Sequence, residues 1–182
     1  MSYVWACYIA VFGVLMVYAA RLVVKSRDVA AKVLARTDEP QSDADARDAY
    51  AAALHQLQCY IGDPLATIRA AVSARPGFVM GHILDAYLNL LGTEPFALED
   101  ARSAARRAAT LPMNEREARH LAAIDALTEG RWIAAGRILE DIAIDHPRDA
   151  LALQAGHLVD FYCGDARMLR DRIARAMPAW DR

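Results

Sequence analysis

The sequence predicts an all-α protein in which one N-terminal transmembrane helix precedes an α-solenoid of about four helical hairpins. Three observations predict this fold. Of the 182 residues, 55% are hydrophobic, and alanine, the strongest helix former, is abundant. Few stretches alternate with the period of two that a half-buried strand requires. From residue 46 onward, prolines and glycines recur about every 35 residues, which indicates repeated helical hairpins.

The N-terminal segment predicts a membrane-spanning helix. The 18 residues from Tyr3 to Ala20 carry no charge, and the apolar run continues after Arg21, so that it covers residues 3–24. At about 1.5 Å per residue, such a helix approaches the roughly 30 Å thickness of the hydrocarbon layer. The alternative is a cleaved signal peptide with Val17-Tyr18-Ala19 as its cleavage site, although no basic residue precedes the apolar run.

The distribution of charge predicts the topology and the domain boundaries. Residues 1–36 carry a balance of +4, whereas the whole chain carries −2. The positive-inside rule then places the N-terminus outside and the rest of the chain in the cytoplasm. Residues 37–45 are polar and acidic and contain Pro40, which predicts a linker between an anchor at residues 1–36 and a repeat domain at residues 46–182. An acidic body does not suggest a nucleic-acid binder.

The beginning of the chain, MSYVWACYIAVFGVLMVYAARLVVKSRDV, resembles the haem exporter protein D family of cytochrome c maturation. The resemblance covers about the first thirty residues, from the Tyr-Val-Trp-Ala start to the basic stretch after the apolar run. It implies a single span followed by a cytoplasmic basic segment. It also implies an alternative function for the protein, as an accessory component of cytochrome c maturation.

The body of the chain predicts eight helices that pair into four hairpins. Pro76 and Pro112 are 36 residues apart, Pro112 and Pro147 are 35 apart, and Gly130 and Gly164 are 34 apart, close to the 34-residue tetratricopeptide period. Glycines 62, 92, 130 and 164 are expected to end helices, and Asp63, Asn114 and Asp165 to cap the next ones. The expected helices cover residues 46–60, 64–75, 78–92, 95–110, 114–129, 131–145, 148–163 and 165–177.

Three segments of the body, residues 62–92, 114–153 and 161–180, are similar in order and spacing to the N-terminal part of the tetratricopeptide repeat protein 38 family. They read GDPLATIRAAVSARPGFVMGHILDAYLNLLG, NEREARHLAAIDALTEGRWIAAGRILEDIAIDHPRDALAL and FYCGDARMLRDRIARAMPAW. Members of that family are usually longer, with further repeats after the Pro-x-Trp that corresponds to Pro178 and Trp180 here. The resemblance implies an α-solenoid and no particular reaction.

Two short motifs in the body look alike: GHILDAY at Gly81–Tyr87 and GHLVDFY at Gly156–Tyr162. In each, a His lies three residues before an Asp, so that both side chains share one helical face. We expect the tyrosines to pack between hairpins and the His-Asp faces to line the inner groove of the solenoid. The partner-binding candidates are His82, Asp85, His120, His157 and Asp160.

Motifs for metal binding and catalysis are lacking. Glu117-x-x-His120 is half of a di-iron motif, but no second Glu-x-x-His occurs. No nucleophile elbow, Gly-rich phosphate loop or HExxH is present either. The three cysteines, at positions 7, 59 and 163, form no ligand pair and are expected to be buried thiols. The sequence therefore predicts no catalytic residue, no metal site and no cofactor.

Arginines form a second kind of candidate site. Arg102 and Arg106 share a helical face, and Arg170 lies in the arginine-rich last helix. They are either solvated charges paired with neighbouring acids or a cradle for an acidic peptide or anionic lipid. The leading hypothesis is a membrane-anchored, non-catalytic scaffold that binds a protein or peptide partner. An enzyme or metal-binding protein built on the solenoid is a second alternative, and homo-oligomerisation through the last helix stays open.

Overall fold

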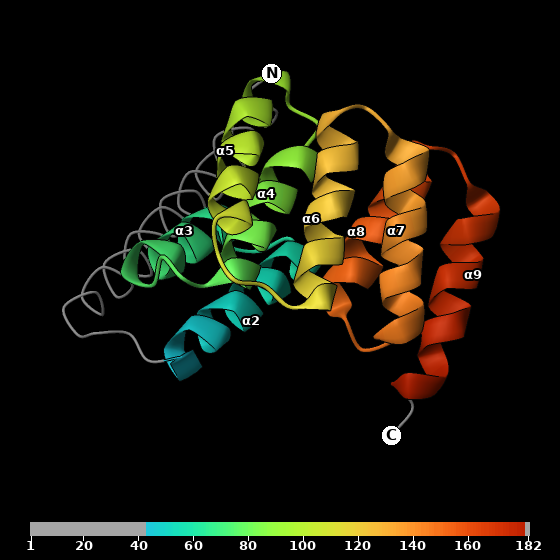
Figure 1. The fold of residues 1–182 in the computed structure, drawn as a ribbon. Coiled ribbons are helices and arrows are strands. Elements are labelled where there is room, and N and C mark those ends of the chain that lie inside the picture. The colour runs from blue at the N-terminus through green and yellow to red at the C-terminus, as the bar shows by residue number, and fades with distance from the viewer. Residues whose placement is uncertain (1–42, 181–182) are drawn as a thin grey trace, which may run out of the picture. The chain divides into compact units, whose positions relative to one another are not determined.

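The computed structural model describes residues 43–180, and these fold into α-helices joined by short loops (Figure 1). The four first helices of the hairpins are α2 (Asp43–Cys59), α4 (Val79–Leu91), α6 (Glu115–Thr128) and α8 (Ala150–Tyr162). The four second helices are α3 (Pro64–Ala74), α5 (Leu98–Ala109), α7 (Trp132–Asp145) and α9 (Ala166–Ala176). Two 3-10 turns, η1 (Pro95–Ala97) and η2 (Met177–Ala179), precede α5 and follow α9.

Local capping explains where most of these helices begin and end. Asp63 and Asp165 accept hydrogen bonds from backbone amides three residues later, at 2.9 and 3.0 Å, and Asn114 forms a capping box with Glu117. Gly62, Gly130 and Gly164 have positive φ, as expected of residues that end helices. Gly92 also ends a helix, as the C-cap of α4, but its φ is −70° and the left-handed conformation falls on Thr93.

The helices pair in sequence order, as the repeat spacing predicts: α2 with α3, α4 with α5, α6 with α7, and α8 with α9. Figure 1 shows α5, α6, α7 and α9 in one layer, with α4 and α8 behind it. Helix α7 also packs against both α8 and α9. The all-α prediction is therefore confirmed for the described residues, and the expected helix ranges agree to within a few residues.

Helix α4 lies at the centre of the packing. All of its 13 residues except Leu88 are buried, and it contacts α2, α3, α5, α6 and α8. The contact with α8 skips one hairpin, whereas a simple solenoid repeat touches only its neighbours. At that contact the Tyr162 hydroxyl donates a 2.7 Å hydrogen bond to the Leu91 carbonyl oxygen. The inner face between the C-terminal ends of α4 and α8 is thus closed rather than an open groove.

One part of the expected fold class is corrected. Within residues 43–180, no helix is long and apolar enough to cross a membrane, so the described fold is all-α without a membrane-spanning element. The segment expected to span, residues 3–24, lies outside the described residues, as do Cys7 and the basic flank. Helix α2 begins at Asp43, within the range expected to form the linker, residues 37–45.

A buried arginine fastens the last helix to the hairpins before it. The Arg172 guanidinium, which is 1% exposed, binds both carboxylate oxygens of Asp160 at 2.8 and 3.0 Å and the Gly136 carbonyl oxygen at 3.1 Å. It also lies 2.9 Å from the Glu140 carboxylate. A Cβ added at Gly156 would lie 2.6 Å from the Arg172 Cζ atom, so a larger residue here would displace the guanidinium from its partners.

Replacing Arg172 should weaken the whole array. The substitution Arg172→Ala leaves the carboxylates of Asp160 and Glu140 without their central cation, which costs about 3–5 kcal/mol when such a pair is buried. Urea unfolding of the full chain, followed by circular dichroism, measures this loss. The control is Arg170→Ala on the same helix, whose exposed side chain should matter by less than about 0.5 kcal/mol. Equal stability of the two variants would contradict the role of Arg172.

Candidate functional site

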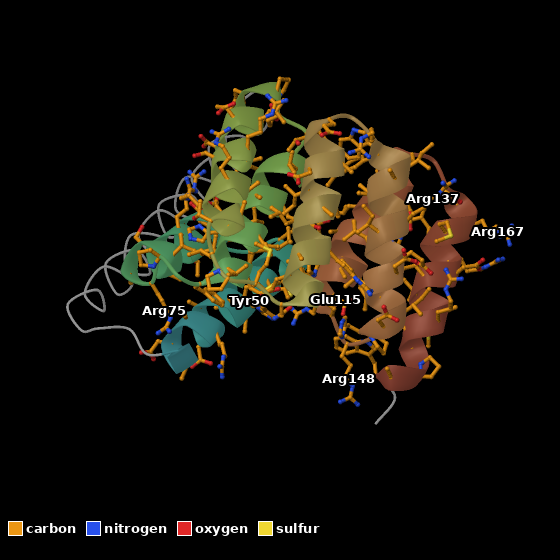
Figure 2. All side chains as sticks on the ribbon, viewed as in Figure 1. Tyr50, Arg75, Glu115, Arg137, Arg148 and Arg167 are labelled. Carbon is orange, nitrogen blue, oxygen red and sulfur yellow. The ribbon has the colours of Figure 1, made fainter. Side chains whose placement is uncertain are left out.

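A cleft of about 710 Å³ opens where the N-terminal ends of α6 and α8 approach α2. Helix α2 contributes Tyr50 and Leu54, and α6 contributes Arg116. The remaining wall comes from the α7–α8 connection, residues 145–150, and from Ala179 of η2. Figure 2 shows Glu115, the first residue of α6, and Arg148, which lines the cleft, at the same lower end of the helices. The cleft is thus at the end opposite the Tyr162 contact.

Asp149 is the buried acid of the cleft. Its side chain caps α8 by accepting the Ala152 backbone amide at 3.0 Å. Its other oxygen accepts a 2.7 Å hydrogen bond from Arg116 Nε and lies 3.0 Å from His120 Nε2. Three donors from two helices therefore converge on one carboxylate, which joins the start of α8 to α6.

His120 extends this contact into a polar chain that reaches a third helix. Its ring is fully buried, with Nε2 facing the Asp149 carboxylate and Nδ1 facing α4. The Tyr87 hydroxyl of α4 lies 3.3 Å from that Nδ1 and 3.2 Å from the His120 carbonyl oxygen. The polar chain, defined here as Tyr87, His120, Asp149 and Arg116, runs from the core to the wall of the cleft.

The electrostatics of the site follow from burial and from these contacts. Burial alone would raise the pKa of Asp149, but His120, the Ala152 amide and Arg116 overcome it, so the pKa lies well below its usual range. Burial, and then the charge of Asp149, raises the pKa of Tyr87 and of Tyr50 far above the value of a free phenol. The carboxylate is thus ionised and both phenols are neutral over the physiological pH range.

This arrangement is suited to binding rather than to proton transfer. His120 and Tyr87 are fully buried, so neither reaches a molecule in the cleft. Among residues 43–180, no group of three or more His, Cys, Asp or Glu side chains could hold a metal ion. The cleft is lined by the polar residues Tyr50, Arg116, His146 and Arg148, by the acid Asp145, and by the apolar Leu54 and Pro147.

The structure places the predicted groove residues inside the protein. Asp85 is 1% exposed and lies 3.2 Å from Arg69 Nε and 3.3 Å from Arg107 Nη2. His82 is also buried, with Nε2 2.8 Å from the Pro76 carbonyl oxygen. Asp160 is held by Arg172. These side chains join helices to one another, because the packing of the first helices leaves them no accessible face.

The structure also shows where the remaining histidine, the di-iron half-motif, the tyrosines and the cysteines lie. His157 is half-buried, and its Nδ1 has no hydrogen-bond partner within the described part of the chain. Glu117, half of the di-iron motif, serves the capping box of α6. Of the two motif tyrosines, Tyr87 is fully buried, whereas Tyr162 departs from the expected packing position, since it is 43% exposed. Cys59 and Cys163 are exposed rather than buried.

The three arginines proposed for an anionic partner are exposed and already have neighbours. Arg102 donates to the Thr128 carbonyl oxygen at 3.2 Å. Arg106 pairs with Glu99 at 2.7 Å, and Arg170 pairs with Asp171 at 2.7 Å. Arg102 and Arg106 lie on α5 and Arg170 lies on α9, so the three do not form one site.

Sequence reasoning missed Tyr50, Arg116, Arg148 and Asp149. Two signals were available for part of this set. Arg116 lies four residues before His120 and so shares its helical face, and Asp149 follows the repeat proline Pro147 at a position suited to an N-cap. No local signal links Tyr50 to them, because α2 approaches this wall only through the fold.

The substitution Asp149→Asn tests the polar chain, because Asn keeps the helix cap but removes the charge. We expect a loss of about 2–3 kcal/mol of unfolding free energy at neutral pH, as for hydrogen bonds to a charged group. The folded pKa of Asp149 is depressed, so its contribution is complete above the unfolded value of about 3.9 and is lost as the pH falls through the folded value.

Urea unfolding of the full chain between pH 7 and pH 2 provides the measurement. The difference between wild type and Asp149→Asn should be constant above about pH 5 and shrink below about pH 4. The matched control, Asp141→Asn at an exposed position of α7, should leave the free energy unchanged within about 0.5 kcal/mol. A difference that grows on acidification would be inconsistent with an ionised Asp149.

Comparison with known proteins adds no assignment to this geometry. No family model matches the chain, and no solved structure matches it. The resemblances of the body to the tetratricopeptide repeat protein 38 family and of the first thirty residues to the haem exporter protein D family stay predictions. The second of these falls on residues outside the described part of the chain. The function therefore has to be argued from the cleft.

Proposed function

We propose that this chain is a non-catalytic binding protein and that a segment of a protein partner occupies the cleft between α2, α6 and the α7–α8 connection. The observation that carries the proposal is the cleft itself, an opening of about 710 Å³ built by the first, third and fourth hairpins together with η2. Stacked helical hairpins characteristically supply such surfaces for protein partners.

The lining favours a polypeptide segment as the ligand. Leu54 and Pro147 provide apolar contacts, while Arg116 and Tyr50 provide hydrogen-bond donors. A peptide presents both kinds of group, with carbonyl oxygens along its backbone and side chains between them. The cleft is open to solvent, which accommodates a chain that continues beyond it.

The polar chain supports binding by holding the walls in place. Arg116 is fixed by Asp149 through Nε at 2.7 Å, while its Nη2 lies 3.7 Å from the sulfur of Met80. Asp149 is itself fixed by His120 and by the N-terminus of α8. A wall that is already ordered loses less conformational entropy when a ligand arrives, which increases affinity.

Site-specific photo-crosslinking in the native cells tests the proposal. A benzoylphenylalanine at Arg148, at the edge of the cleft, should give a discrete adduct with one protein partner. Benzoylphenylalanine at Arg106, an exposed position of α5, should give no such adduct. The substitution Ala150→Trp fills the cleft and should abolish the adduct.

The matched control is Ala122→Trp on the exposed face of α6, which should leave the crosslink intact. Circular dichroism confirms that both tryptophan variants keep their helices. A crosslink that persists at full yield in a folded Ala150→Trp protein would reject the cleft as the binding site. Equal adducts from Arg148 and Arg106 would reject it as well.

A further inference from the structure

A second surface, on the opposite flank from α2, carries an unbalanced display of positive charge. The arginine face, defined here as Arg137 of α7 together with Arg167 and Arg170 of α9, lies on two helices that pack against each other. Figure 2 shows Arg137 and Arg167 extending from these neighbouring helices on the same side of the molecule. The whole chain has a net charge of −2. The positive charge of this face is therefore opposite in sign to the net charge of the protein.

The imbalance arises because several acids near this face are withdrawn from solvent, whereas the three arginines are exposed. Asp160 is buried and the Glu140 side chain is 12% exposed, and both pair with the buried Arg172. Asp171, the only acid within α9, is 25% exposed at its side chain, whereas Arg167 and Arg170 are 84% and 75% exposed. Solvent therefore meets the guanidinium groups of Arg137, Arg167 and Arg170 and, one turn after Arg137, the exposed carboxylate of Asp141.

These guanidinium groups have more N–H donors than the neighbouring carboxylates can accept. Arg167 and Arg170 share the single carboxylate of Asp171, at 3.5 and 2.7 Å, although a planar guanidinium offers five N–H donors. Arg137 forms no ion pair within residues 43–180. Donors that can take a carboxylate in bidentate fashion are thus exposed on both helices.

We infer that the arginine face binds an acidic segment of a protein partner. A few carboxylates spaced along a peptide match a few guanidinium groups spread over two adjacent helices. The inference is independent of the cleft, since none of its residues lines that opening.

Fluorescence anisotropy with fluorescein-labelled octaglutamate and the full chain tests the inference at low ionic strength. The double substitution Arg167→Gln and Arg170→Gln should weaken binding by about fivefold or more. The matched control, Arg102→Gln and Arg106→Gln on α5, makes the same change in net charge on another face and should weaken binding by less than about twofold. Circular dichroism verifies that both variants remain folded.

Each contrary result overturns the inference. Absence of octaglutamate binding does so, and so does an equal loss in both double variants, which would indicate a general charge effect. Tighter binding of octathymidylate, or of vesicles containing phosphatidylserine, than of octaglutamate would assign the face to nucleic acid or to a lipid surface instead. Binding of an uncharged Gly-Ser peptide of equal length with the same affinity would exclude an electrostatic site.

Discussion

The contact between His120 and the Asp149 carboxylate is the constraint on which the arrangement of the first helices depends. Asp149 is the N-cap of α8, so a ring nitrogen of α6 at 3.0 Å fixes where α8 begins. The other nitrogen meets the Tyr87 hydroxyl of α4. Because an unpaired buried polar group costs roughly 1–3 kcal/mol, each of these three helices is held in register by the other two, and Arg116 is held at the cleft.

The duplicated Gly-His-x-x-Asp motif acts as a helix junction rather than as a duplicated site. In each copy the glycine permits a close approach: a Cβ at Gly81 would lie 2.6 Å from Val72 Cγ1, and one at Gly156 would lie 2.6 Å from Arg172 Cζ. In each copy the aspartate, four residues later, pairs with arginines of second helices. The repeated residues therefore reflect repeated packing, which leaves the site to residues outside the motif.

Helix positions could be predicted from the sequence because their determinants are local. Asp63, Asn114 and Asp165 cap helices through neighbours three residues away, and the glycine and proline spacing is visible in the chain itself. Burial of His82 and His120 could not be predicted in this way. It follows from the curvature of the array, which depends on contacts such as that between Tyr162 and Leu91, 71 residues apart. A repeat period indicates which helices pair but not how tightly the stack closes.

The closure also explains why the cleft lies where it does. The first helices α4 and α8 meet at their C-terminal ends through Tyr162, whereas at the other end Asp149 and Arg116 leave an opening toward Tyr50 of α2. A ligand in this opening contacts the first and last hairpins at once. A ligand that binds only the folded state would then raise the free energy of unfolding of the whole array. Because the polar chain holds the wall of the cleft and also joins the helices, ligand binding and the stability of the array are linked through it.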